Sequence, residues 1–115
     1  MDTYQDQARL LKCLAHPMRL QILDQICQAE ECVCHLAAVL AKPQPYVSQQ
    51  LAVLRNAGLI RDRREGTHIF YGLADEQAGI HISAILAALL PAPAGAIRGH
   101  AHIAGCCCPR CAAPE

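Results

Sequence analysis

The chain has 115 residues, is 53% hydrophobic and carries a formal net charge of zero. This length is typical of one domain with a small core, which must be aliphatic because only 3% of residues are aromatic. No signal peptide is visible, and Pro91 and Pro93 end the apolar run 80–90 well short of a membrane span. We therefore expect a cytoplasmic protein without a membrane partner, whose eight cysteines are thiolate ligands or redox groups rather than a disulfide framework. No catalytic triad, phosphate loop or paired carboxylates suggest an enzyme.

Charge is distributed unevenly along the chain. Residues 1–41 carry three cations against five carboxylates, whereas residues 42–64 carry five cations against one. A local basic stretch is the electrostatic signature of a DNA-binding surface, although a solvated charged face would look the same.

Apolar residues recur with a helical period over residues 4–15, 18–27 and 30–40, which predicts three helices. His16-Pro17 separates the first two, and Pro17 suits the first turn of the second. A short turn at residues 41–44 leads to a fourth helix that starts near Pro45, ends at residue 56 or 57 and is followed by Gly58. Its expected buried stripe consists of Val47, Leu51 and Leu54.

Residues 59–63 and 68–73 predict two strands, and Gly66 supplies the positive φ of the turn between them. A last helix is expected over about residues 76–90, and it presents the apolar side chains of Ile82, Ile85, Leu86 and Leu89 or Leu90. The order of elements predicts a mostly α-helical, winged helix-turn-helix domain with a small β-hairpin over residues 1–90. Residues 91–115 are rich in Ala, Pro, Gly, His and Cys, and we interpret them as a flexible tail.

Cys32 and Cys34 fall in the first turn of the predicted third helix, directly before the predicted DNA-recognition helix. A helix N-terminus favours the thiolate form of cysteine, and thiolates select soft or borderline ions. Residues i and i+2 do not share a helix face, so one ion binds both sulfurs only if the first turn is loosened or begins at the site. The alternative is that both cysteines are buried as small hydrophobic residues.

Three segments together resemble the ArsR/SmtB family of metal-sensing repressors over about residues 4–90. They are LAHPMRLQIL at residues 14–23, CVCHL at 32–36 and VSQQLAVLRNAGLI at 47–60. The resemblance implies a homodimer that is paired through its first and last helices. Its two recognition helices would enter successive major grooves of double-stranded palindromic operator DNA. The alternative is that both apolar helices pack within one protomer.

Polar residues off the buried stripe of the fourth helix are candidates for DNA contact: Gln44, Tyr46, Ser48, Gln49 and Gln50. The resemblance favours Ser48 and Gln49 for base or phosphate contacts, and Gln is able to address adenine bidentately. Cations of the turn and the wing are expected to meet phosphates or the minor groove: Lys42, Arg61, Arg63, Arg64 and His68. Such contacts make affinity salt-dependent without specifying sequence. For each residue the alternative is a solvated polar face.

Two sulfurs are too few for a complete site, because As(III) takes three and Cd(II), Pb(II) or Zn(II) three or four. The chain departs from the family pattern here: Ala37 replaces a third thiol, and His35 stands where Asp is common. The tail thiols are Cys106, Cys107, Cys108 and Cys111. They would complete the site by folding back, form an independent metal site, or belong to a dispensable, redox-labile tail.

Other candidate ligands are weaker. His16 and His35 are auxiliary candidates, each more typical of a helix cap or a surface group, and Cys13 and Cys27 are expected in the core. The second family site on the last helix is not expected, because the residues after Asp75 and His81 do not match its pattern.

The leading hypothesis is a transcriptional repressor released from DNA by As(III), Sb(III), Cd(II), Pb(II) or Zn(II). Metal binding would bend or unwind the entrance of the third helix and thereby shift the recognition helix. One alternative is a thiol redox or persulfide sensor on the same fold, in which a disulfide moves the same helix. Another is a metal-storage or delivery protein without sequence-specific DNA binding.

Overall fold

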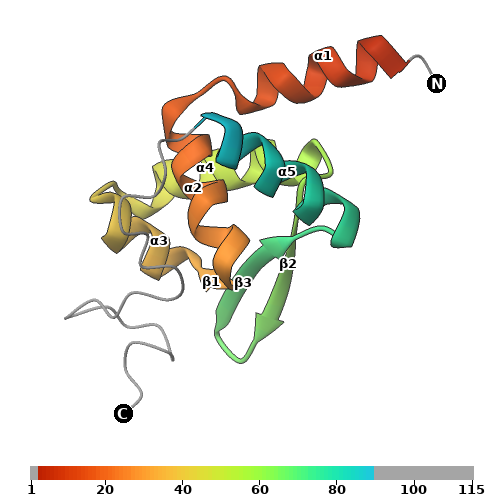
Figure 1. The fold of residues 1–115 in the computed structure, drawn as a ribbon. Coiled ribbons are helices and arrows are strands. Elements are labelled where there is room, and N and C mark those ends of the chain that lie inside the picture. The colour runs from red at the N-terminus through yellow and green to blue at the C-terminus, as the bar shows by residue number, and fades with distance from the viewer. Residues whose placement is uncertain (1–2, 90–115) are drawn as a thin grey trace.

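The structure is a computed structural model that describes residues 3–89; the tail cysteines 106, 107, 108 and 111 lie outside the described residues. The elements are α1 (Thr3–Leu14), α2 (Pro17–Gln28), β1 (Glu31–Cys32), α3 (Val33–Leu40), α4 (Gln44–Asn56), β2 (Ile60–Glu65), β3 (His68–Leu73) and α5 (Glu76–Leu89). Helix α1 extends outward at one end of the molecule, and the β2–β3 hairpin projects at the other (Figure 1). None of these helices is long and apolar enough to cross a membrane. The predicted winged helix-turn-helix is confirmed.

The start of α2 is capped as its sequence predicts. His16 has an extended backbone (φ −154°, ψ 124°), and its Nδ1 accepts a hydrogen bond of 3.1 Å from the backbone N–H of Met18. Pro17 occupies the first turn, where a missing N–H costs no helical hydrogen bond. Of the roles predicted for His16, the structure therefore confirms the helix cap.

The core is formed where α2, α3, α4 and α5 meet. Its fully buried members include Ile22 and Leu23 of α2 and Leu36 of α3, together with the predicted stripe of α4: Val47, Leu51 and Leu54. Cys13 is also buried, as predicted, whereas Cys27 is half-buried and packs against the edge of this core.

Not every apolar residue of the last helix faces inward. Ile82 and Leu86 are buried, but Leu89 is 66% exposed. Leu89 therefore belongs to the exposed apolar surface of α5.

The sheet has three strands, in the order β1-β3-β2, instead of the predicted two. Glu31 pairs with Tyr71 and Cys32 with Phe70 in antiparallel register. The helix predicted from residue 30 therefore begins only at Val33. A two-residue strand carries no periodic pattern, so its conformation is set by pairing with β3 rather than by local sequence.

The wing is a hairpin whose turn agrees with the prediction. Gly66 has φ 61°, a value that most side chains disfavour. Strand β2 extends to Glu65, two residues beyond the predicted end, and pairs with β3 from Ile60↔Leu73 to Glu65↔His68.

Candidate nucleic-acid interface and thiol site

Helix α4 presents polar side chains on the face opposite its buried stripe. Gln44, Ser48 and Gln49 are exposed, while Tyr46 is half-buried and packs against the core. Gln50 is also half-buried, and its Oε1 accepts a hydrogen bond of 3.0 Å from Nε of Arg19. The exposed residues thus form the accessible part of the recognition helix, and Gln50 is held by α2.

Arg19 connects three helices. Besides its bond to Gln50 on α4, its Nη1 donates a 2.8 Å hydrogen bond to the backbone oxygen of Cys13. That oxygen lies near the C-terminus of α1, where carbonyl groups lack helical partners. The orientation of α4 is therefore linked to α1 through one side chain, a role that the sequence did not reveal.

The turn before α4 is short. Ala41 ends α3 in the left-handed conformation (φ 55°), and its N–H and that of Lys42 bond carbonyls of the last turn of α3. Lys42 is exposed directly before the N-terminal end of α4. The connection between α3 and α4 is therefore short and is hydrogen-bonded to the end of α3.

The wing arginines lie on two faces of the sheet. Strand residues alternate between faces, so Arg61 and Arg63 share one face and Arg64 lies on the other. On the face of Arg64, Asp62 forms a 3.4 Å ion pair with Arg55 of α4. Arg64 is exposed and has no carboxylate partner within the described part of the chain. His68, at the start of β3, is half-buried, and its Nδ1 lies 3.5 Å from Oγ1 of Thr67.

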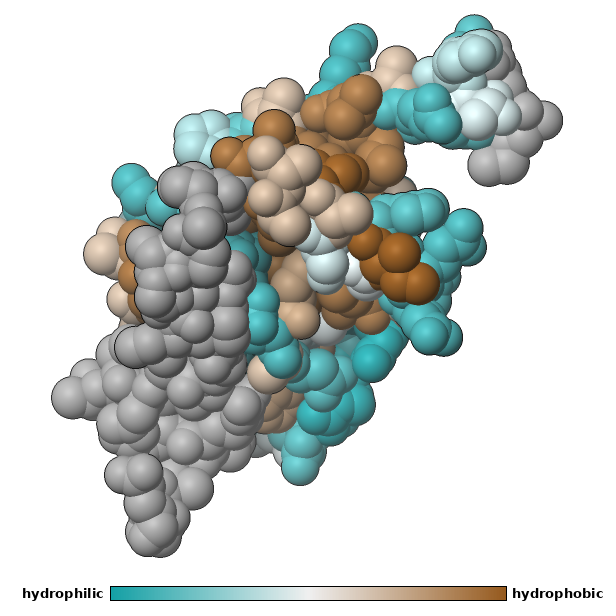
Figure 2. Space-filling view, viewed as in Figure 1, coloured by the Kyte–Doolittle hydropathy of each residue, from teal (hydrophilic) through white to brown (hydrophobic). Residues whose placement is uncertain are grey.

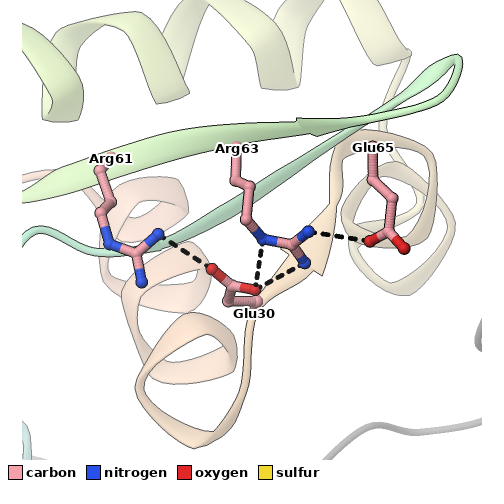
Figure 3. A network of polar contacts seen from close by, with 4 residues as sticks. All are labelled: Glu30, Arg61, Arg63 and Glu65. Atoms are coloured by element: carbon pink, nitrogen blue, oxygen red, sulfur yellow. Dashed lines mark hydrogen bonds and ion pairs between the residues drawn. The ribbon is translucent and has the colours of Figure 1, made fainter.

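Arg61 and Arg63 are instead bound by the carboxylate of Glu30 (Figure 3). Nη1 of Arg61 lies 3.0 Å from Oε2, and Nε and Nη2 of Arg63 lie 3.1 and 2.9 Å from Oε1. Nη1 of Arg63 also donates to Glu65 at 2.8 Å. We call Glu30, Arg61, Arg63 and Glu65 the Glu30 cluster.

The charges of the Glu30 cluster reinforce one another. The hydrogen bond from Arg63 lowers the pKa of Glu30, partial burial opposes this, and the positive charges of Arg63 and Arg61 lower it further. In return, Glu30 and then Glu65 raise the pKa of Arg63. The ionised forms of Glu30 and Arg63 are therefore favoured in the folded protein.

The two predicted thiol ligands converge. Sγ of Cys32 lies 2.7 Å from Sγ of Cys34. Cys32 is the N-cap residue of α3 with extended backbone (φ −83°, ψ 157°), not a residue of the first turn. The helix begins at the site, so the sulfurs meet without any unwinding. The spacing of the two cysteines required either a loosened first turn or a helix that begins at the site, and the structure shows the second.

A buried acid and a buried histidine flank the thiols. The side chains of Glu31 and His35 are both 0% exposed, and Nε2 of His35 lies 3.9 Å from Oε1 of Glu31. The prediction that His35 is a cap or a surface group is therefore wrong. The sequence did not indicate that His35 is buried, because Glu31 beside it is positioned by the long-range pairing of β1 with β3.

Cys32 and Cys34 are chemically suited to a soft ion, since both sulfurs face one point. Within residues 3–89, no group of three or more His, Cys, Asp or Glu side chains is placed to hold a metal ion. By itself the pair would offer two donors, fewer than the three or four that such an ion requires.

A short turn, an exposed polar helix and an adjacent hairpin define a winged helix-turn-helix DNA-binding protein. The sequence profile described as "Bacterial regulatory protein, arsR family" matches residues 16–62. Over 80 residues the chain is 49% identical to the biofilm growth-associated repressor of Agrobacterium fabrum, covering 70% of this chain and 68% of that protein. The chain belongs to the ArsR/SmtB family of transcriptional repressors.

Solved structures agree with this assignment. Reduced HlyU from Vibrio cholerae superposes with a TM-score of 0.71 at 31% identity, covering 77% of this chain and 94% of that one. The homodimeric winged helix-turn-helix domain of Mb0332 from Mycobacterium bovis, described as a possible ArsR-family regulator, gives 0.70 at 32% identity, with coverages of 75% and 80%.

Proposed function

We propose that this protein is a homodimeric repressor released from operator DNA by a soft metal or metalloid ion bound at Cys32 and Cys34. The observation that carries the proposal is the 2.7 Å approach of the two sulfurs at the junction of β1 and α3. Candidate ions are As(III), Sb(III), Cd(II), Pb(II) and Zn(II), all of which accept thiolate ligands. Further donors would come from the tail thiols 106, 107, 108 and 111.

The DNA-binding half of the proposal uses the exposed residues of α4 and the cations beside it. Gln44, Ser48 and Gln49 would meet base edges or nearby phosphates in the major groove. Lys42 and Arg64, which have no carboxylate partner among the described residues, would contact phosphates.

Exposed apolar residues on the first and last helices support a dimer. Tyr4 and Leu11 of α1 are 83% and 58% exposed, and Ile80 and Leu89 of α5 are 62% and 66% exposed. Figure 2 shows hydrophobic side chains gathered on the side of the molecule where α1 and α5 lie. Two such helices in each protomer would supply the apolar surface that a symmetric interface buries.

Release of DNA would follow from the connection between the thiols and α4. Cys32 is the last residue of β1 and occupies the N-cap position of α3, and α3 is joined to α4 by the short turn at Ala41. An ion that draws in a further ligand would displace the start of α3 and so move α4 in the groove. Such couplings are typically about 1–3 kcal/mol, or roughly 5- to 150-fold in affinity.

Fluorescence anisotropy with a duplex from the promoter upstream of its own gene tests the proposal. Each ion is titrated against wild type, Cys32→Ser and a chain ending at Gly99. The control is Cys27→Ser, in which the altered thiol lies beside Ser83 of α5. We expect the ion to release wild type and Cys27→Ser but not Cys32→Ser. Release of Cys32→Ser by every inducing ion as in wild type would refute the proposal. A chain ending at Gly99 that no longer responds would place donors in the tail.

The close sulfurs also favour a second candidate, a thiol redox or persulfide sensor. Two thiols in contact are well placed for oxidation to a disulfide or for persulfide chemistry. Release of DNA by peroxide or polysulfide, with no response to metal ions, would favour this function. Thiolate-to-metal charge-transfer bands at one ion per protomer would favour the first.

A further inference from the structure

We propose that Glu30 is an intramolecular competitor of DNA: it occupies the wing arginines Arg61 and Arg63, which otherwise bind backbone phosphates. Its position two residues before Cys32 then makes the wing respond to the thiol site. The first statement concerns the metal-free protein alone; the second rests on the proposed function.

The competition follows from guanidinium chemistry. A guanidinium group binds a carboxylate or a phosphate through the same pair of N–H donors. Arg63 donates from Nε and Nη2 to Glu30 and from Nη1 to Glu65. Its Cζ also lies over the Phe70 ring, 5.0 Å from the ring centroid. Arg61 uses Nη1 for Glu30. Both side chains must leave Glu30, at least in part, before a phosphate takes the same donors.

The backbone of β3 leaves space for the side chain of Glu30 beside the two arginines. Gly72 lies opposite Arg61 in the sheet, and a Cβ atom on it would come within 3.0 Å of Cγ and 3.3 Å of Oε2 of Glu30. Glycine at this position thus leaves the room that the carboxylate occupies. The side chain of Glu30 is held between the two arginines that extend from β2 toward it (Figure 3).

The same cross-strand rows connect the Glu30 cluster to the thiols. Phe70 pairs with Cys32 on one side and with Arg63 on the other, so these three residues form one row across the sheet. Strand β1 has only two residues, and a small displacement of Cys32 therefore carries Glu30 with it. The displacement of the start of α3 that a bound ion would cause therefore moves Glu30 as well, in the direction that tightens it on the arginines and weakens the wing contacts.

The first experiment uses metal-free protein and the operator duplex. Glu30→Gln keeps the shape of the side chain but removes its charge. Because loss of the exposed ion pairs frees Arg61 and Arg63, we expect the variant protein to bind operator about threefold to tenfold more tightly per protomer. Gly72→Ala moves Glu30 without changing any charge and is expected to shift affinity in the same direction. Thermal unfolding confirms that both variants are folded. Unchanged affinity in both variants would overturn the competition.

The second experiment compares each protein with and without the inducing ion. Glu65→Gln is the matched control, because Glu65 pairs with the same Arg63 but lies at the wing turn, away from Cys32. We expect Glu30→Gln to reduce the ratio of metal-free to metal-loaded affinity severalfold and Glu65→Gln to retain the wild-type ratio. A wild-type ratio in Glu30→Gln would refute the coupling. If the ion does not release wild type, the proposed function fails, and the metal-free affinities still decide the competition.

Discussion

Arg64 offers a direct test of the proposed DNA-binding surface. It is exposed and lies on the sheet face that Asp62 and Arg55 connect to α4, whereas Arg61 and Arg63 are bound to Glu30 on the other face. If Arg64 contacts one phosphate in each protomer, Arg64→Gln removes two contacts from a dimer. Each contact changes the slope of log K against log salt by about 0.9. The slope should therefore become less steep by about 1.8.

The same slope gives the expected loss of affinity. At about 0.15 M salt, the release of about 0.9 counterion by one phosphate contact contributes about 1 kcal/mol to binding. Two lost contacts therefore cost about 2 kcal/mol, or about 30-fold in Kd. Fluorescence anisotropy over a series of salt concentrations measures both quantities. Arg9→Gln is the control, because Arg9 lies on α1 beside Asp6. A slope for Arg64→Gln equal to that of Arg9→Gln would refute the placement of DNA on this face.

Two further predictions concern how α4 and the dimer are held. Arg19→Met removes the hydrogen bonds to Gln50 and to the Cys13 carbonyl. It should lower the free energy of unfolding by about 1–3 kcal/mol and weaken operator binding. An unchanged denaturant midpoint and an unchanged affinity would contradict the role of Arg19. Leu11→Glu places a charge on an α1 residue that is 58% exposed in the protomer, so it should weaken the dimer by on the order of 100-fold while leaving the helical circular dichroism intact. Sedimentation measures the dimer, and a wild-type dissociation constant would exclude α1 from the interface.

Interactions between near neighbours were sufficient to predict most of the architecture. The 3.6-residue period of apolar side chains placed α1, α2, α4 and α5, and the α4 stripe of Val47, Leu51 and Leu54 is buried as predicted. His16-Pro17 and Gly66 marked a cap and a turn because their backbone preferences are local. The two cysteines proposed as ligands were also chosen from sequence, since their spacing and position before the recognition helix are visible in the chain.

Only the folded chain decided what surrounds those thiols. Glu30 meets Arg61 and Arg63 across 31 and 33 residues, and Cys32 belongs to a strand that exists because β3 pairs with it. His35 is buried although its sequence neighbours gave no sign of it. A short strand and a distant ion pair leave no periodic trace in a sequence, because their partners are brought together only when the core closes.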